Sequence, residues 1–414
     1  MKDTPEFHWK NFINLAVIVV ALGYFVDIFD LTLFAMLRTQ SLISLGIPTE
    51  EQVEKGILLL NSQMAGMLVG GIFWGILGDK KGRIKVLFGS ILLYSLANLA
   101  NAFVHNIQSY ALLRFISGVG LAGELGAGVT LVSEILPTSH RGLGTALVAT
   151  IGVLGAVFGG FVVEFIPWRY CYVIGGSLGF LLLFLRFKIQ ESSLFNKSRE
   201  GQSCDVQWGK FSSLFTSFER LKKFILCIFM GIPIWYVAGL LMAFSPELSK
   251  ELGVNGVVTS SRSIAISYLG LAFGDMFCGF VSQKIKKRLG AVLIFSLATI
   301  FFIILLFSTT PNKSNNYFYS LCFFIGLGAG FWAMFVTIAA EQFGTNIRAT
   351  VATSVPNFVR GAVIPMTLSF KFLKADFGII KSMAMVGIVV FLLNIIATLL
   401  LQETFHKDLN YFES

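Results

Sequence analysis

The sequence is poor in charged residues. Only 13% of its 414 residues are charged, whereas a soluble protein of ordinary composition carries about a quarter. Hydrophobic residues make up 55% of the chain, and the mean hydropathy is +0.76. A soluble core could not bury this much apolar surface, so we expect lipid to surround most of the chain.

Histidine and cysteine are also scarce, with four and five copies. The cysteines fall mostly inside apolar runs, the histidines form no cluster, and no spacing typical of metal ligands occurs. The phosphate-binding pattern, a glycine loop followed by Lys-Ser or Lys-Thr, is absent. We therefore expect no metal, no cofactor, no disulfide and no enzymatic active site.

Acidic residues are fewer than basic ones, which leaves a net charge of +9. Such an excess can indicate a nucleic-acid partner. Here the basic residues cluster in short segments between apolar runs, a pattern that reflects membrane orientation instead. We therefore expect no nucleic-acid binding.

Long apolar runs recur along the chain, each near the length of about twenty residues that crosses a bilayer as a helix. The first is too long for a cleaved signal peptide. The runs predict an all-α membrane protein with twelve transmembrane helices. The predicted spans are residues 13–36, 57–78, 86–104, 109–133, 142–163, 169–188, 223–245, 262–282, 291–310, 318–340, 350–373 and 380–402.

The charges between the spans predict orientation and domains. Most of the 32 lysines and arginines fall in alternate segments, which places both termini in the cytoplasm of a multi-pass protein in a bacterial inner membrane. The longest polar segment is expected to be a cytoplasmic linker between two six-helix bundles. The predicted division is 1–188, 189–222 and 223–414, the last ending in a short cytoplasmic tail.

A weak internal repeat supports this division. Glu134 and Arg141 stand seven residues apart after the fourth span, and Glu341 and Arg348 stand seven apart after the tenth. Glycines precede both pairs. Two pseudo-symmetric halves of this kind are typical of transporters that rock about a central site.

A loop motif lies between the second and third spans, Gly75-Ile-Leu-Gly-Asp79-Lys-Lys-Gly82-Arg83-Ile-Lys. It resembles the loop motif of the major facilitator superfamily. Its glycines allow a tight turn and close helix approach, and Asp79 can accept hydrogen bonds from a helix N-terminus. In the second half Gln283 replaces the aspartate, so a gate built on the motif should be stronger in the first half.

Further motifs are similar to those of sugar porters and metabolite:proton symporters within that superfamily. They are Arg114-Phe-Ile-Ser-Gly-Val-Gly-Leu-Ala-Gly-Glu124, Glu134-Ile-Leu-Pro-Thr-Ser-His-Arg141-Gly, Pro167-Trp-Arg169 and Glu191-Ser-Ser-Leu-Phe195. The resemblance implies a rocking transporter that works as a monomer. It also implies a cytoplasmic gate made of Gly75, Asp79, Gly82, Arg83, Glu134, Arg141, Glu341 and Arg348.

Ionisable residues inside a membrane span are costly and indicate function. Asp27 and Asp30 share one face of the first span, and Asp30 and Arg114 both lie roughly 8–9 Å from the periplasmic end. They can meet if their helices adjoin, and protonation of Asp30 would then release Arg114. The pair is either such a proton switch or a structural ion pair. Asp27, which lies deeper, is the alternative protonation site.

Two more charges lie at membrane depth. Glu124 is expected to be a second protonatable site, a latch to the loop motif, or a structural carboxyl group. Arg360 lies between Pro356 and Pro365, which are predicted to kink its helix. Its partner is either Asp275 or the substrate anion.

The predicted substrate contacts combine these arginines with polar and aromatic side chains on spans expected to line a cavity. They are Arg114, Arg360, Tyr24, Gln63, Trp235, Tyr236 and Trp332.

The leading hypothesis is a proton-coupled symporter that imports a small carboxylate-bearing or zwitterionic metabolite. Its expected partners are that substrate, a proton and the lipid bilayer, and the proton gradient is its energy source. One alternative is a proton-coupled antiporter that exports drugs or a secreted metabolite such as a siderophore. The other is a ligand sensor of the same fold that does not transport.

Overall fold

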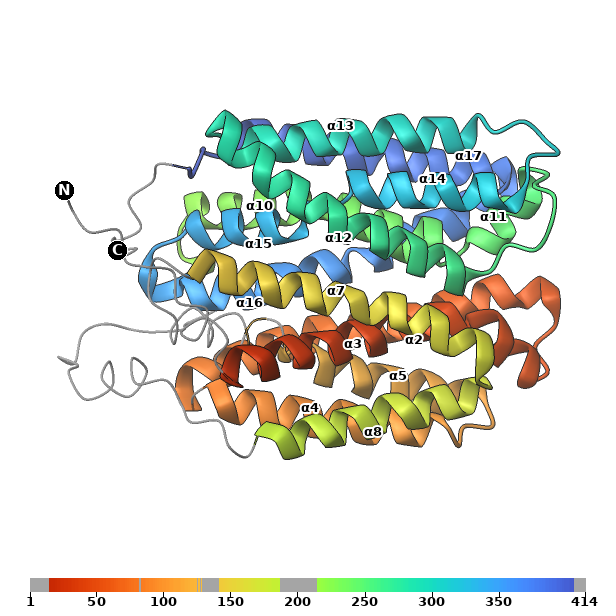
Figure 1. The fold of residues 1–414 in the computed structure, drawn as a ribbon, viewed down its shortest axis with the longest axis horizontal. Coiled ribbons are helices and arrows are strands. Elements are labelled where there is room, and N and C mark those ends of the chain that lie inside the picture. The colour runs from red at the N-terminus through yellow and green to blue at the C-terminus, as the bar shows by residue number, and fades with distance from the viewer. Residues whose placement is uncertain are drawn as a thin grey trace.

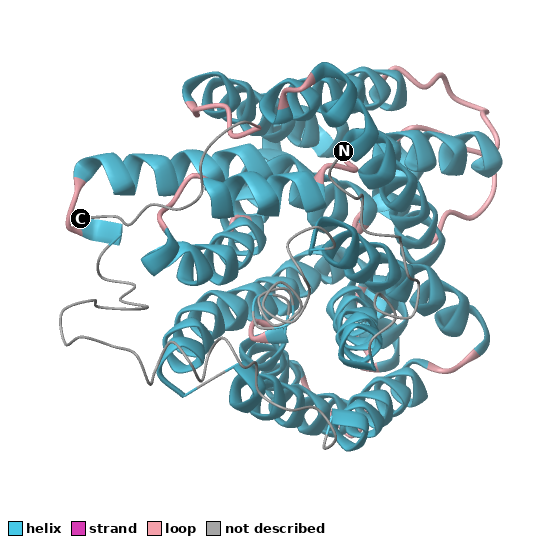
Figure 2. Cartoon of the chain, turned by 60° about the vertical axis from the view of Figure 1, so that its left-hand side comes forward, coloured by secondary structure: helices cyan, strands magenta, loops and turns pink. Residues whose placement is uncertain are grey.

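A computed structural model describes residues 15–81, 83–124, 126, 128, 141–186 and 214–405. Apart from one isolated bridge between Asn255 and Ser314, every regular element among these residues is helical (Figure 2). Ten of the described segments are long and apolar enough to cross a membrane. The predicted all-α membrane fold is confirmed at this level.

The helices gather in two groups, one above the other in Figure 1. The first group contains α2 (Leu15–Ser44), α3 (Thr49–Lys81), α4 (Arg83–Asn101), α5 (Ile107–Leu121), α7 (Arg141–Phe165) and α8 (Trp168–Arg186). The second contains α10 (Phe218–Tyr236), the π-helix η2 (Val237–Met242), α11 (Ser245–Glu251), α12 (Ser260–Ile285), α13 (Arg288–Phe307), α14 (Asn315–Gly328), α15 (Trp332–Glu341), α16 (Thr345–Gly361) and α17 (Val363–Leu400). Most of the predicted linker lies outside the described residues.

The bundle has two ends. Helix α2 begins and α17 ends at the left of Figure 1, which we call the terminal end; α2 ends and α3 begins at the opposite end. The two groups meet mainly where α7 packs on α12 and α3 packs on α16. At Gly160 of α7 an added Cβ would lie 2.4 Å from the Cβ of Ala265. Small residues therefore let the groups approach closely, as in other membrane helix pairs.

Several helices of the second group are broken. The π-helix η2 continues α10 after Pro233, and α14 and α15 are separated by residues 329–331. Helices α16 and α17 meet at Ala362, between the two prolines that predicted a kink there. Broken helices at membrane depth expose backbone groups to a cavity or a neighbouring side chain.

Helix α17 also contains a break. Gly378 has a φ of 74°, which favours glycine, and it divides the apolar stretch of 51 residues from Thr350 to Leu400. The Glu251 carboxylate accepts the backbone N–H groups of Ile379 and Ile380. It thereby caps the helix that resumes after the break.

Candidate functional site

Arg360 lies in the last turn of α16 and has no exposed surface. Its Nη2 is 4.0 Å from Oδ2 of Asp27, a fully buried residue of α2 in the other group. Its Nη1 donates a hydrogen bond of 3.2 Å to Oδ1 of Asn357. The Asp27 carboxylate accepts no hydrogen bond from the described residues. Asp27 and Arg360 thus face each other across the two groups, and both retain capacity for another partner.

Aromatic side chains surround this arginine. The Arg360 guanidinium lies 5.9 Å from the Trp235 ring and 5.6 Å from the Trp332 ring. The Trp332 indole donates a hydrogen bond of 3.0 Å to the Tyr24 hydroxyl, which again joins the two groups. The Tyr24 ring fills the space over Gly152 of α7, where no Cβ would fit. Three of the predicted aromatic contacts therefore come together around Arg360.

Two predicted contacts do not join this cluster. The Tyr236 hydroxyl donates to the Met383 carbonyl at 2.7 Å, and its ring packs against Phe391 of α17. The Gln63 amide donates to the Leu31 carbonyl at 3.4 Å, between α3 and α2. Tyr236 thus has a structural role within the second group, and Gln63 ties two helices of the first.

Asp275, one predicted partner of Arg360, has a different role. Its Oδ1 accepts the backbone N–H of Ala333 at 3.1 Å. That N–H belongs to the first turn of α15 and lacks a helical partner because the chain breaks after α14. Asp275 therefore caps a broken helix, and Asp27 is the carboxylate that faces Arg360.

Asp30 and Arg114 come from α2 and α5, and both are fully buried. Arg114 is the cation whose charge acts on the Asp30 carboxylate. The guanidinium lies over the rings of Phe34 and Tyr172, at 5.4 and 5.8 Å. No hydrogen bond joins the two charged groups among the described residues. Protonation of Asp30 therefore need not break a direct hydrogen bond to Arg114.

Gly175 of α8 makes room for Asp30. An added Cβ at Gly175 would lie 2.1 Å from Oδ1 of Asp30. The position of the carboxylate thus depends on a glycine of another helix, and no motif in the sequence indicated that glycine.

A stripe of buried polar residues on α4 lies beside this pair. Ser95, Asn98 and Asn101 recur at helical spacing, and each has a polar side-chain atom without a hydrogen-bond partner among the described residues. The Ser117 hydroxyl of α5 donates a hydrogen bond of 3.4 Å to Oδ1 of Asn98, which joins the stripe to the helix that carries Arg114. Sequence reasoning missed this stripe, although its spacing inside an apolar span was a usable signal.

Glu124 forms an ion pair that the sequence did not predict. Its carboxylate accepts hydrogen bonds from Nη1 of Arg186, at 3.1 Å, and from Nη2 through a shorter contact. Both side chains are buried, and they lie over Gly23 of α2. Arg186 ends an apolar span, so its charge was assigned to membrane orientation alone. Of the three roles expected for Glu124, this geometry fits the structural carboxyl group.

The predicted gate is described only in part. The side chains of Asp79, Arg83 and Arg141, together with Gly82 and Glu134, lie outside the described residues. At Gly75 an added Cβ would meet nothing within 4 Å, so this glycine makes no close helix contact.

The second-half gate residues have partners at the terminal end. Glu341 forms an ion pair with Arg288 at the start of α13, and Arg348 donates from Nε to the Phe343 carbonyl at 3.3 Å. Arg288 is the last residue of Ser282-Gln-Lys-Ile-Lys-Lys-Arg288, the second-half copy of the loop motif in which Gln283 replaces the aspartate. Glu341 thus connects the tenth predicted span to that copy.

Three ion pairs join the two groups at the opposite end. Nη2 of Arg38 binds both carboxylate oxygens of Glu247, at 2.6 and 2.7 Å, and its Nε donates to the Ala243 carbonyl. The other pairs are Glu54 with Lys371, at 2.8 Å, and Glu164 with Arg262. These contacts join the two groups at this end, and none of them was predicted from the sequence.

The comparisons with known proteins agree with this architecture. A family model described as Major Facilitator Superfamily matches residues 20–366. The cis,cis-muconate transport protein of Acinetobacter baylyi is 24% identical and covers 95% of each chain. The niacin transporter of the same organism is 26% identical and covers 94% of each chain.

A solved structure has the same fold. The xylose transporter from E. coli, in a partially occluded inward-open conformation, superposes with a TM-score of 0.74. The match covers 96% of this chain and all of the other, at 16% identity. At this identity the similarity shows the fold alone.

Proposed function

The chain belongs to the Major Facilitator Superfamily, and we propose that it is a proton-coupled symporter that imports a small planar carboxylate by alternating access. It is a transporter of metabolites and not an enzyme, as its transporter-named relatives indicate. The substrate class, the proton and the direction are our proposal.

The arrangement around Arg360 carries the substrate assignment. A substrate carboxylate would take the place of Asp27 and form paired hydrogen bonds with the guanidinium, a geometry suited to arginine. The indoles of Trp235 and Trp332 flank that position and favour a flat, unsaturated group beside the carboxylate. The substrates named for two relatives, cis,cis-muconate and niacin, combine these two features.

Asp30 and Arg114 are proposed as the proton switch. When Asp30 is ionised, the Arg114 guanidinium stabilises its negative charge. Protonation of Asp30 removes that attraction, which releases Arg114 and favours another arrangement of the helices. The polar stripe at Ser95, Asn98 and Asn101 supports this role because such side chains can hydrogen-bond water beside Asp30. Asp27 remains the competing protonation site.

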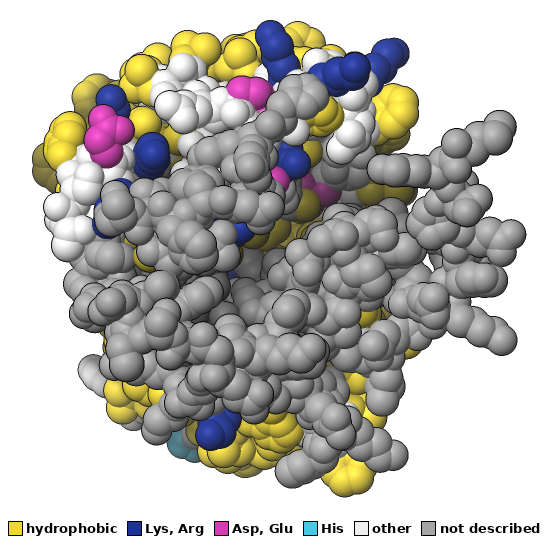
Figure 3. Space-filling view, turned by 90° about the vertical axis from the view of Figure 1, so that its left-hand side faces the viewer, with side chains coloured by type: hydrophobic (Ala, Val, Ile, Leu, Met, Phe, Trp, Pro, Cys, Tyr) yellow, Lys and Arg dark blue, Asp and Glu magenta, His cyan; other side chains and the backbone are white. Residues whose placement is uncertain are grey.

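The orientation completes the proposal. The terminal end exposes Lys284, Lys286 and Lys287, and Figure 3 shows lysine and arginine side chains around its rim. The positive-inside rule supports a cytoplasmic location for this end. We propose twelve crossings, with one lying on each side of Gly378, and a monomer in a bacterial inner membrane. The three ion pairs at the opposite end then correspond to an inward-facing state closed toward the periplasm.

Uptake by proteoliposomes tests the proposal. The purified chain would be assayed with aromatic and unsaturated carboxylates, amino acids and sugars, with and without an inward proton gradient. We expect gradient-driven accumulation of planar carboxylates only. Accumulation of sugars or amino acids instead would refute the substrate class. Export driven by the gradient would favour the antiporter of drugs or secreted metabolites, and binding without flux would favour the sensor.

A further inference from the structure

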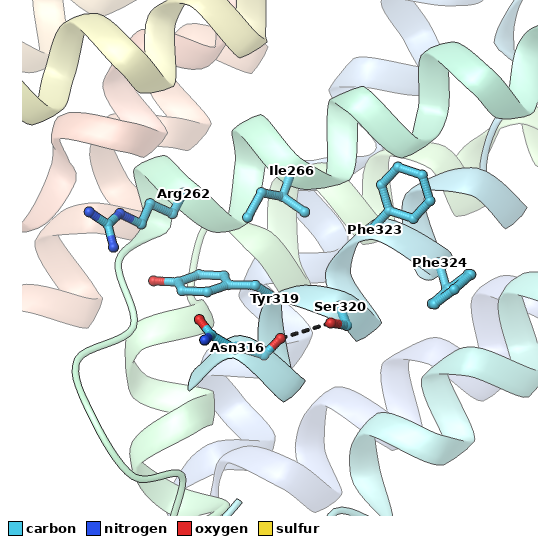
Figure 4. Close-up of a pocket in the computed structure, with 7 residues that line it drawn as sticks. All are labelled: Arg262, Ile266, Asn316, Tyr319, Ser320, Phe323 and Phe324. Carbon is cyan, nitrogen blue, oxygen red and sulfur yellow. Dashed lines mark hydrogen bonds between the residues drawn. The ribbon is translucent and has the colours of Figure 1, made fainter. Parts of the chain in front are cut away.

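A groove of about 500 Å³ opens between α12 and α14 near the opposite end (Figure 4). It lies away from Asp27 and Arg360, and the proposed transport function does not use it. Its lining residues are Arg262, Ile266, Asn316, Tyr319, Ser320, Phe323 and Phe324.

The lining changes from polar to apolar along the helices. Arg262 and Asn316 lie in the first turns of α12 and α14. Phe323 and Phe324 lie seven and eight residues after Asn316, so they are roughly 10–12 Å deeper at a rise of 1.5 Å per residue. In Figure 4 the polar tips of Arg262, Tyr319 and Asn316 point to one end and the two phenylalanines lie at the other. A phospholipid has the same order, with its phosphate at the membrane surface and its chains deeper.

The apolar part continues onto the membrane-facing surface. The Phe323 ring contacts Phe273 and Phe324, with centroids 6.2 and 5.6 Å apart, and Phe324 stacks on Phe302 at 5.1 Å. Phe273 is 46% exposed and Phe324 is 42% exposed. The groove therefore opens toward lipid, where an acyl chain can follow this aromatic row.

The polar part offers donors for a phosphate. The Arg262 guanidinium bonds Glu164 through Nε alone, and Arg262 is exposed, which leaves Nη1 and Nη2 for a second acceptor. The Tyr319 hydroxyl accepts the backbone N–H of Thr259 at 3.1 Å and keeps its own proton to donate. Charge-assisted hydrogen bonds of this kind are the strong ones.

We propose that this groove binds one anionic phospholipid of the outer leaflet, with its phosphate on Arg262 and one acyl chain along Phe323 and Phe324. An anionic headgroup is favoured because the cation of a zwitterionic headgroup would compete with Arg262 for the phosphate. Arg262 also holds Glu164 of the other helix group. The lipid therefore contacts one of the three ion pairs that close the opposite end.

Native mass spectrometry of the full-length protein tests the site with two probes of equal acyl chains, phosphatidylglycerol and phosphatidylethanolamine. We expect preferential retention of one phosphatidylglycerol molecule. Arg262→Gln removes the phosphate partner and should weaken its binding about fivefold, the contribution of one basic side chain at a membrane surface. Ser320→Trp fills the groove without touching the Arg262–Glu164 pair and should also weaken binding.

Two control variants separate the groove from general charge effects. Glu164→Gln breaks the ion pair but keeps Arg262, and Lys313→Gln removes a cation that lies over Tyr317, outside the groove. Both should retain phosphatidylglycerol. Equal retention of the two lipids by the unmodified protein would overturn the proposal. So would wild-type binding by either groove variant, because the lipid would then be annular or bound elsewhere.

Discussion

Asp27 and Asp30 are three residues apart on α2, yet each faces an arginine of a different helix group. Asp27 lies 4.0 Å from Arg360 of α16, in the second group, while the cation whose charge acts on Asp30 is Arg114, in the first. All four side chains are fully buried. One turn of α2 thus links Asp27 and Arg360, which face each other between the groups, to Asp30 and Arg114, which both belong to the first group. This connection offers a physical route from substrate binding to proton binding.

Substitution of Arg360 tests the substrate contact. We expect Arg360→Gln to weaken carboxylate binding about 100-fold, because a charge-assisted paired contact is lost. Arg360→Lys should recover only about tenfold of that loss, since lysine keeps the charge but not the fork geometry. Counterflow exchange at graded substrate concentrations measures both. Lys250→Gln, which removes an exposed cation of α11, is the control. Equal affinity in Arg360→Gln and the unmodified protein would show that the substrate anion binds elsewhere.

The glycine beneath Asp30 gives a second test. Gly175→Ala places a methyl group 2.1 Å from the present position of Oδ1 of Asp30, so the carboxylate must move. We expect gradient-driven accumulation to be lost while counterflow exchange persists. Gly279→Ala is the matched control, because an added Cβ there meets nothing within 4 Å. Normal accumulation in Gly175→Ala would mean that the exact position of Asp30 does not matter for coupling.

The ion pairs at the opposite end are expected to hold that end closed. Arg38→Gln removes the two hydrogen bonds to Glu247 and the bond to the Ala243 carbonyl. The open population should rise about tenfold or more, because bonds to charged groups contribute on the order of 1.5–3 kcal/mol each. Spin labels at Thr49 and Val257 would report it as a longer distance component. Lys55→Gln breaks an ion pair within α3 only and should cause no shift. Unchanged distances in Arg38→Gln would contradict a gating role.

The Glu124–Arg186 pair is expected to contribute stability. Removal of one partner leaves a buried charge, so Arg186→Gln and Glu124→Gln should each lower the free energy of unfolding by on the order of 3–5 kcal/mol. The double substitution should be less destabilising than the sum of the two, because no lone charge remains. Thermal unfolding in detergent measures all three variants. Strictly additive losses would indicate that the two side chains do not interact.

Much of the architecture could be predicted because hydropathy depends only on local sequence. Every predicted span overlaps a described helix, and the kink predicted between Pro356 and Pro365 falls at Ala362. The break between α14 and α15 was not predicted. Because of this break, the backbone N–H of Ala333 has no acceptor within its helix and donates to Asp275 instead. Asp275 is therefore not the partner of Arg360.

The pairing of the buried charges could not be predicted, because a single sequence does not fix the rotation of each helix. Asp27, Asp30, Arg114, Glu124 and Arg360 were selected correctly as buried charges, since charge at membrane depth is rare. Their partners depend on which helix faces adjoin.

Charges near the span ends were missed for a different reason. Glu164, Arg186 and Arg262 lie in the first or last turn of their helices, and Arg38 lies six residues before the end of α2. In the sequence such residues cannot be distinguished from charges that only set membrane orientation. Only the packing of the helices shows that they form ion pairs, within the first group for Arg186 and between the two groups for the other three.

The most direct test of the account compares Asp30→Asn and Asp27→Asn in proteoliposomes, with gradient-driven accumulation and counterflow exchange of one planar carboxylate measured for each. We predict that Asp30→Asn abolishes accumulation and retains exchange, because it removes the proton switch and leaves Arg360 intact. Asp27→Asn should bind the carboxylate more tightly, since the internal competitor for Arg360 is gone, and should still accumulate it. Accumulation that survives in Asp30→Asn and disappears in Asp27→Asn would contradict the assignment and place the proton on Asp27.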